Sequence, residues 1–406
     1  MAQNIQNLLR ITSNVLTKSI TRTSYKNGIR MLYSESALGL DGYKKSRKNV
    51  QMQFADMSDK FREKMKVYAN DTSSSMIFTE DLKNMLFLVN NSTEDMQLLL
   101  KMMIKFHSQN SQMRFGSFIF GPVVMRTYHF LDQVDEALAA FRNPQLDGFF
   151  DQQTSYQLLM DMLHNHGRFA ELRNVYEDLK TKPTIDPKRP TILVLAGCFK
   201  ENTPDSMKYA LDVWQTLKIK GTQPMRRSVT FFAGLALNQG RPEITVEVIS
   251  SIRDFNYVTI RNLKVAALAE LDRLDDILPL FRISLSNDNG ATSKQTYTED
   301  VIARVEAAIK RSGLGADSAI VHMVRRLKEN DHITHTALDS IIGSEIAHYV
   351  VDPEQRRSGN YNNPRFPNQR YPNQRYNNYD NNGSDQERSF RSAYNPRQRL
   401  GLKDLV

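Results

Sequence analysis

The apolar and polar residues in the middle of the chain alternate with the period of an α-helix. The segment Thr154–Lys180, TSYQLLMDMLHNHGRFAELRNVYEDLK, shows this most clearly. Its first half places apolar side chains on one helix face, at Tyr156, Leu159, Met160 and Leu163. Gly167 follows, a residue type that often ends a helix in the left-handed conformation. The apolar pattern then resumes, so the segment predicts two helices joined by a turn at Gly167.

The same outline recurs along the chain. It returns in Leu82–Phe106, Val123–Phe141, Val229–Ile252 and Leu263–Phe281. Tyr209–Pro224 is equivalent to a second helix and is preceded by the apolar run Ile192–Phe199. Large residues at equivalent places in the second helices are separated by 35, 38, 35 and 32 positions, namely Phe141, Tyr176, Trp214, Ile249 and Phe281. A period near 35 with two helices per period is typical of an α-solenoid.

One helix pair cannot bury its apolar stripe alone, but stacked pairs bury a continuous core. We therefore predict an all-α fold, a right-handed α-solenoid of about six degenerate helix-turn-helix repeats over residues 78–285. Residues 35–77 are expected to form an N-terminal linker or helix. The basic cluster Lys44–Lys48 within them is expected to be a solvated linker.

The repeats are followed by a predicted linker, 286–297, and a helical cap, 298–350, which would shield the last repeat. Its three helices are expected at about Glu299–Arg311, Asp317–Lys328 and Thr336–Tyr349. Thr296 and Glu299 form a capping box for the first of them.

Composition changes after the cap. Residues 351–406 contain RFPNQRYPNQRYNNYDNNG, which is rich in Pro, Asn, Arg and Tyr and poor in aliphatic residues. Such a segment cannot bury enough apolar surface to fold, so we predict a disordered tail. Alternating arginine and tyrosine also suits weak contact with single-stranded RNA, through phosphate pairing and base stacking. The residues expected to make this contact are Arg365, Arg370, Tyr371, Arg375 and Tyr376. A neutral solubilising tail is the alternative.

The first 34 residues contain five basic residues and no acidic one, and they are rich in Ser and Thr. The segment also has apolar residues at helical spacing. Together these features are typical of a mitochondrial transit peptide. We predict import into the mitochondrial matrix, with cleavage near Arg30–Ser34. A disordered basic arm is the alternative.

The net charge of +9 belongs to the two ends of the chain. Residues 1–34 contribute +5 and residues 353–406 contribute +5, which leaves the body between them at −1. The high isoelectric point therefore gives no argument that the body binds nucleic acid.

At the level of motifs the repeats resemble the pentatricopeptide repeat family. The resemblance rests on ALDVWQTLKIKGTQP (Ala210–Pro224) and on TSYQLLMDML followed by Gly167 and Arg168. Tetratricopeptide repeats fit less well, because they expect a tryptophan in the first helix and Trp214 lies in a second one. The resemblance implies an RNA-binding factor in mitochondrial transcript maturation that supports respiratory-chain gene expression. In this family a polar residue early in each first helix reads one base.

The matching positions here are apolar: Val123, Leu158, Leu193 (or Ile192) and Phe231. No base code is readable from them, so phosphate contacts and stacking are the better candidates. Lys188, Arg189, Arg226 and Arg227 are expected to contact phosphate, because they lie near the starts of first helices. The alternative is that these four residues lie in solvated loops between repeats and contact no ligand. Phe231 is a candidate for base stacking, with a core position as its alternative.

No pattern for catalysis, a cofactor or a metal is present. The chain lacks HExxH, a P-loop and a GxGxxG motif, and its one cysteine, Cys198, lies in an apolar run. His164 and His166, two residues apart, point to different helix faces. His332 and His335 resemble a helix start. We therefore predict no enzyme and no cofactor.

Two functions remain open. The first is binding of single-stranded mitochondrial RNA in transcript processing, maturation or stability, with RNA-processing or ribosomal proteins as further partners. The alternative is a protein-binding scaffold in the matrix for mitoribosome or respiratory-complex assembly, which the neutral body and the apolar code positions favour. An RNA-cutting enzyme would need a cluster of carboxylates on one face.

Overall fold

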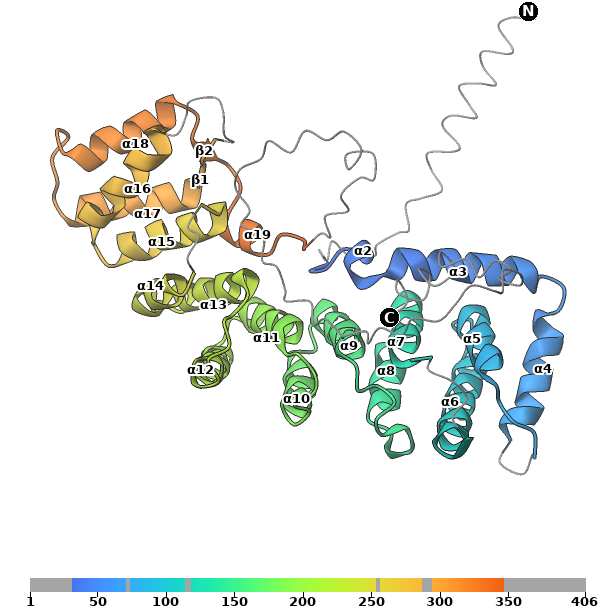
Figure 1. Cartoon of the computed structure of the whole chain (residues 1–406). Helices are drawn as coiled ribbons and strands as arrows, with labels where there is room; N and C mark the ends of the chain where they lie inside the picture. Colours follow the sequence, from blue (N-terminus) through green and yellow to red (C-terminus); the bar gives the residue numbers. More distant parts are fainter. Residues whose placement is uncertain (1–30, 71–73, 114–117, 253–255, 287–293, 347–406) are drawn as a thin grey trace, which may run out of the picture.

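The computed structural model describes residues 31–70, 74–113, 118–252, 256–286 and 294–346. In this part of the chain the fold is all-α apart from two strands of two residues each (Figure 1). The predicted α-helical repeat fold is confirmed. None of the helices among the described residues is long and apolar enough to cross a membrane.

Six helix pairs follow one another in chain order (Figure 1). The pairs are α5 (Thr79–Leu88) with α6 (Thr93–Met113), α7 (Gly121–Leu131) with α8 (Val134–Phe141), α9 (Gln153–Asn165) with α10 (Phe169–Lys180), α11 (Lys188–Glu201) with α12 (Pro204–Ile219), α13 (Arg226–Asn238) with α14 (Pro242–Ser250), and α15 (Val258–Glu270) with α16 (Leu274–Ser286). A 3-10 turn, η1 (Pro144–Leu146), lies between α8 and α9. Each first helix packs on the first helix of the next pair, so these helices form one continuous row.

The turns inside the pairs have a left-handed residue where the sequence predicts one. Gly167 has φ of 70° and Gly240 has φ of 66°. Asp132 and Asp272 take the same place in two other pairs with φ of 55° each. Asp tolerates this conformation because its short side chain can hydrogen-bond locally.

The first helices are buried on nearly all sides. Residues Ser155–His164 in α9, Pro190–Cys198 in α11 and Ser228–Leu237 in α13 are buried without a break. By contrast, α10 buries only a stripe, at Leu172, Val175, Tyr176 and Leu179. A helix that is buried all round needs neighbours on both faces. The second helices cover one face of the row.

The two ends of the chain cover the other face (Figure 1). At the N-terminal end, α2 (Glu35–Leu38) leads into α3 (Leu40–Gln53), which packs on α5 and α7; α4 (Ser58–Ala69) follows and packs on α6. At the C-terminal end α19 (Leu338–Ile342) packs on α13 and α15 and covers this face. By contrast, α17 (Glu299–Arg311) packs on α15 and α18 (Ala319–Glu329) packs on α16, so these two helices continue the array beyond the sixth pair. Strand β1 (Tyr297–Thr298) pairs in parallel with β2 (Ile333–Thr334) at the base of this end.

The two ends meet above the middle of the row. Tyr33 and Ile346 form a parallel bridge, in which the Ile346 amide donates to the Leu32 carbonyl at 2.7 Å and the Ser34 amide donates to the Ile346 carbonyl at 3.2 Å. We call residues 32–39 and 338–346 together the strap. The strap and α3 cross the first-helix row from one end to the other.

The ends differ from the sequence-based expectations in three places. The basic cluster Lys44–Lys48 lies in helix α3, not in a linker. Leu32 and Tyr33, inside the predicted transit peptide, are 3% and 4% exposed in the strap. The last predicted helix is limited to α19, because the chain beyond it bridges to Tyr33. Residues 1–30 of the predicted transit peptide and 347–406 of the predicted tail lie outside the described residues.

Gly121, at the start of α7, offers a test of the packing between repeats. A Cβ atom there would lie 2.8 Å from the backbone oxygen of Phe149 and 2.0 Å from Oε1 of Gln152. Gly121→Ala is expected to lower the free energy of unfolding by about 1–3 kcal/mol, since the backbone of the α8–α9 linker has to shift. Urea unfolding followed by circular dichroism measures this. Gly315→Ala is the control, because nothing lies within 4 Å of a Cβ atom at Gly315, and equal stability of the two variants would contradict the packing.

Candidate functional site

The face of the first-helix row is the surface that a repeat array would offer to a linear ligand. Here the strap and α3 lie over it (Figure 1). The five positions at which a base would be read are between 0% and 2% exposed, namely Val123, Leu158, Ile192, Leu193 and Phe231. They are core residues, so base reading by these side chains does not occur in this conformation.

Phe231 corrects an expectation drawn from the sequence. Its ring packs on Phe199, with ring centroids 5.8 Å apart, and the Arg227 guanidinium lies 4.9 Å from its centroid. Because the ring is buried between these groups, it presents no free face to an RNA base.

The four predicted basic residues lie at the starts of two neighbouring first helices. Lys188 and Arg189 begin α11 and are exposed, whereas Arg226 and Arg227 begin α13 and are half-buried. A shallow hollow between the two helix starts is lined by Lys188, Met225 and their neighbours. The fold therefore brings Lys188, Arg189 and Arg226 to one edge of the row. The Arg189 guanidinium also donates to Oε1 of Gln157 at 3.5 Å, and its charge lowers the pKa of Tyr33 in the strap against the larger effect of burial.

The N-termini of the first helices differ in charge from those of the second helices. Among the first helices, α7, α9, α11, α13 and α15 have no acidic residue in the first turn, and α5, with Glu80 and Asp81, is the exception. The second helices α6, α8, α10, α12, α14 and α16 all have one or two. A helix N-terminus has a partial positive charge, which an acid in the first turn offsets. At α11 the Asp186 carboxylate accepts from the Lys188 amide at 3.0 Å, but at α13 the N-cap residue Met225 gives no side-chain cap. The edge formed by the first-helix starts is therefore the more positive one.

Arg226 stacks on an aromatic ring at this edge. Its guanidinium lies 3.9 Å from the ring centroid of Tyr257, which precedes α15. Tyr257 is 39% exposed and Met225 is 42% exposed. We call Lys188, Arg189, Met225, Arg226 and Tyr257 the N-terminal ledge. Sequence reasoning missed Tyr257, because the predicted helix pair began at Leu263, whereas α15 begins at Val258, directly after this tyrosine.

Arg227 points the other way, under the strap. Its Nη2 donates to the Ser344 carbonyl oxygen, and its Nε has no hydrogen-bond partner among the described residues. Burial, with a smaller contribution from the neighbouring Arg226, lowers the pKa of Arg227 to about 10. The side chain therefore holds the strap and does not belong to the ledge.

A buried carboxylate lies on the row beneath the strap. Asp161 of α9 contacts Nε2 of His129 at 2.9 Å and accepts from Asn165 at 2.9 Å. It also acts on Tyr33 of the strap: burial is the main cause that raises the pKa of the Tyr33 hydroxyl, and the charge of Asp161 raises it further. The strap therefore covers polar side chains of the first-helix row.

The histidine pair of the HNHG turn does not converge. His164 is buried, and burial lowers its pKa. His166 is instead bonded through Nε2 to Asp132 at 2.7 Å. Among the described residues no group of three His, Cys, Asp or Glu side chains could hold a metal ion.

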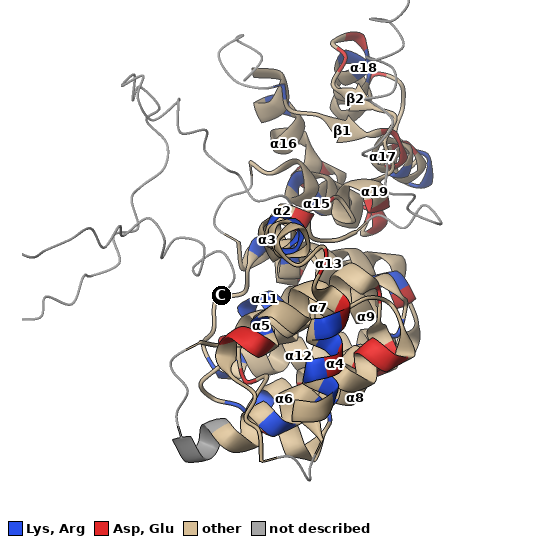
Figure 2. Cartoon of the chain, turned by 90° about the vertical axis from the view of Figure 1, so that its right-hand side faces the viewer, with Lys and Arg blue, Asp and Glu red and all other residues tan. Residues whose placement is uncertain are grey.

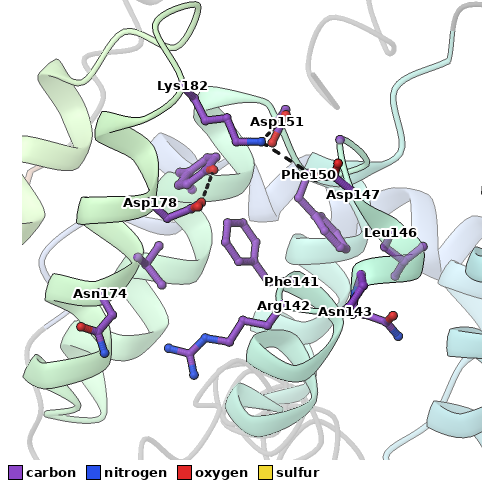
Figure 3. A pocket seen from close by; sticks show the side chains of 14 residues that line it. Phe141, Arg142, Asn143, Leu146, Asp147, Phe150, Asp151, Asn174, Asp178 and Lys182 are labelled. Carbon is purple, nitrogen blue, oxygen red and sulfur yellow. Dashed lines mark hydrogen bonds and ion pairs between the residues drawn. The ribbon is translucent and has the colours of Figure 1, made fainter.

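The cavity of Figure 3, about 530 Å³ in volume, lies on the second-helix side between the α8–α9 linker and α10. Its charged groups are mostly satisfied within the cavity. Tyr156 donates to Asp178 at 2.6 Å, and Lys182 pairs with Asp151 at 3.0 Å. Phe141 and Arg142 line the other side (Figure 3). With both signs of charge present, this cavity suits a protein side chain better than a phosphate.

Charge on the remaining surface is mixed. In Figure 2 basic and acidic stretches are interspersed along the helices of that view. The predicted tail contacts Arg365, Arg370, Tyr371, Arg375 and Tyr376 lie outside the described residues, which end at Ile346, two residues from the carbonyl that Arg227 holds.

Comparison with known proteins gives a consistent set of relatives. No protein-family profile matches the chain. It is 30% identical over 272 residues to pentatricopeptide repeat-containing protein 2, mitochondrial, of Mus musculus, which covers 67% of this chain and 71% of the relative. The Homo sapiens protein of the same name is 26% identical over 59% of this chain and 62% of its own length. That of Danio rerio is 24% identical over 77% and 81%.

Cys198 provides a test of the burial of the first-helix row. The side chain is 1% exposed, and burial raises the pKa of its thiol to about 12, although Arg173 opposes this. Since the thiolate is the reactive form, the folded protein is expected to resist iodoacetamide at pH 8 and to react fully in denaturant. Mass spectrometry of the intact protein measures this. Rapid alkylation of the folded chain would contradict a buried row.

Proposed function

Because the chain belongs to the family of mitochondrial pentatricopeptide repeat-containing protein 2, we propose that it binds single-stranded RNA in the mitochondrial matrix. Its role would be in the processing, maturation or stability of transcripts, in support of respiratory-chain gene expression. The relatives are named mitochondrial. Location in the matrix and binding of RNA are the parts that we propose.

The observation that supports this function best is the N-terminal ledge. Three cations, Lys188, Arg189 and Arg226, lie along helix starts whose first turns have no acidic residue, and an exposed tyrosine lies among them. Asp186, just before α11, lies 4.0 Å from the Lys188 ammonium and offsets part of this charge. Cations spaced along a groove contact the phosphates of a single strand, and an aromatic ring stacks on its bases.

The ledge recognises RNA without reading bases. Phosphates pair with Lys188, Arg189 and Arg226, while a base stacks on the exposed part of Tyr257. Helix starts beside them attract the same phosphates. The array would then act by covering a stretch of transcript and so altering access of other factors to it. No bond is made or broken by this chain in the proposal.

The tail adds a second contact. Its arginines and tyrosines, Arg365, Arg370, Tyr371, Arg375 and Tyr376, follow the strap after Ile346. The described chain ends two residues after Ser344, which contacts Arg227 of α13. Two weak RNA contacts in one chain strengthen one another.

The alternative is a matrix scaffold for ribosomal, RNA-processing or assembly proteins. It is favoured by the net charge of −1 over residues 35–352 and by the mixed-charge cavity of Figure 3. In that case the ledge would be an ordinary solvated edge, and a partner's side chain would occupy the cavity.

Charge reversal on the ledge distinguishes the two functions. Arg226→Glu and Lys188→Glu are each expected to weaken binding of single-stranded RNA about tenfold in low salt, since each removes a cation that pairs with a phosphate. The slope of log affinity against log salt should become shallower by about 0.7 for each phosphate that the variant no longer neutralises. Fluorescence anisotropy with a labelled RNA measures both values.

Arg282→Glu makes the same change of charge on an exposed residue of α16 and serves as the control. A variant that ends at Asp352 tests the tail. If the ledge variants bind like the Arg282 variant, or if binding disappears entirely with the tail, the array does not bind RNA and the scaffold function takes its place.

A further inference from the structure

The strap lies over polar groups that a nucleic acid could use. Beneath it are the guanidinium groups of Arg126 and Arg227 and the carboxylate of Asp161. Arg126 donates from Nε to the Leu38 carbonyl at 2.9 Å, and Arg227 donates to the Ser344 carbonyl. Two cations of the first-helix face, the buried Arg126 and the half-buried Arg227, therefore hold backbone carbonyls of the strap.

A phosphate group could take the place of the strap carbonyl in both of these hydrogen bonds. A carbonyl oxygen is a neutral acceptor, whereas a phosphate oxygen is a charged one and forms the stronger bond with a guanidinium. An RNA backbone in place of the strap would therefore satisfy the same donors at least as well. Arg227 is also the direct chain neighbour of Arg226 on the ledge, so the two sites are continuous.

The closed strap leaves several polar atoms unsatisfied. Among the described residues the buried Tyr33 Oη, Asp161 Oδ1 and Arg227 Nε have no hydrogen-bond partner. All three groups lie around the junction of the two chain ends, because the charges of Asp161 and Arg227 both act on Tyr33. Buried polar atoms without partners disfavour the closed state relative to one in which water or a ligand reaches them.

The junction joins the two halves of the strap through two backbone hydrogen bonds. On the N-terminal side α3 is fixed to the row by Tyr43, whose hydroxyl donates to the Leu86 carbonyl at 2.9 Å. On the C-terminal side α19 is seated on α13, where Ile342 lies against Gly234. Between these anchors, the hydrogen bonds that join the halves within the described part of the chain are the two of the Tyr33–Ile346 bridge. Parting of the halves there would break these two hydrogen bonds and expose Leu32 and Tyr33, which are buried in the closed state.

We propose that the strap is a gate: it closes the first-helix groove in the free protein, and single-stranded RNA bound at the ledge extends into the groove by displacing it. The inference rests on the proposed function, because it concerns the same RNA and the residues next to the ledge. In the closed state RNA contacts the ledge alone, and opening adds Arg227 and Arg126.

A reversible lock tests the gate directly. Tyr33→Cys and Ile346→Cys are introduced into the full chain together with Cys198→Ala. Bridge partners in neighbouring strands lie close enough for a disulfide. Binding of a labelled single-stranded RNA of about 20 nucleotides is measured by anisotropy before and after reduction. The oxidised protein is expected to bind about tenfold more weakly than the same protein reduced, because the open fraction sets the apparent affinity.

A proline substitution tests the opposite change, because it is expected to open the gate. Ser34 has φ of −65°, which suits proline, and its amide is one of the two that hold the bridge. Ser34→Pro should bind the RNA several-fold more tightly than the wild-type chain. Ser34→Ala is the matched control, because it also lacks the side-chain cap of α2 but keeps the amide. Circular dichroism confirms that all variants are folded.

The outcomes separate the two proposals. Equal affinity of the oxidised and reduced proteins, with RNA still bound, would overturn the gate and leave the ledge as the RNA site. Absence of RNA binding in every form, including Ser34→Pro, would overturn the proposed function and the gate together. Tighter binding upon reduction and in the Ser34→Pro variant, but not in Ser34→Ala, is the result expected of a gate.

Discussion

The fold depends on a row of first helices that is apolar on nearly every side. A helix of this kind must be covered on two faces, because exposed apolar surface costs free energy in proportion to its area. In α9, α11 and α13 the buried residues run without a break. The second helices cover one face, and the strap and α3 cover the other. A helical array that is open along one side would leave this second face in water.

The same constraint separates this protein from an array that reads bases. Side chains early in the first helices, such as Leu158 and Leu193, serve packing and are inaccessible. The accessible edge of the row consists of helix N-termini, and Lys188, Arg189 and Arg226 lie there. Under the proposed function, this edge would recognise RNA by charge and stacking, irrespective of sequence. The face of the first-helix row is covered in this structure, because the strap and α3 lie over it.

Much of the fold could be predicted from the sequence because its signals are local. The helical period and Gly167 indicated the pairs, and the near-constant spacing indicated the array. The strap could not be found in this way, since its bridge joins residues 33 and 346, which are too far apart for any periodicity to relate. One signal was available: the unbroken apolar run Ile192–Phe199 does not fit a helix with one solvent-facing side. The ledge was partly predictable from charge, whereas the inward turn of Arg227 depends on Ser344 and was not.

Hydrogen–deuterium exchange of the strap tests most directly whether the chain's own ends cover the row. In the free full-length protein, peptides spanning 31–39 and 338–346 should exchange slowly, because the Ser34 and Ile346 amides are bonded to each other's segments. Addition of single-stranded RNA should speed exchange in these peptides while α13 stays protected. Fast exchange of both peptides in the free protein, at the rate of an unstructured chain, would show that the row is open and would contradict the account.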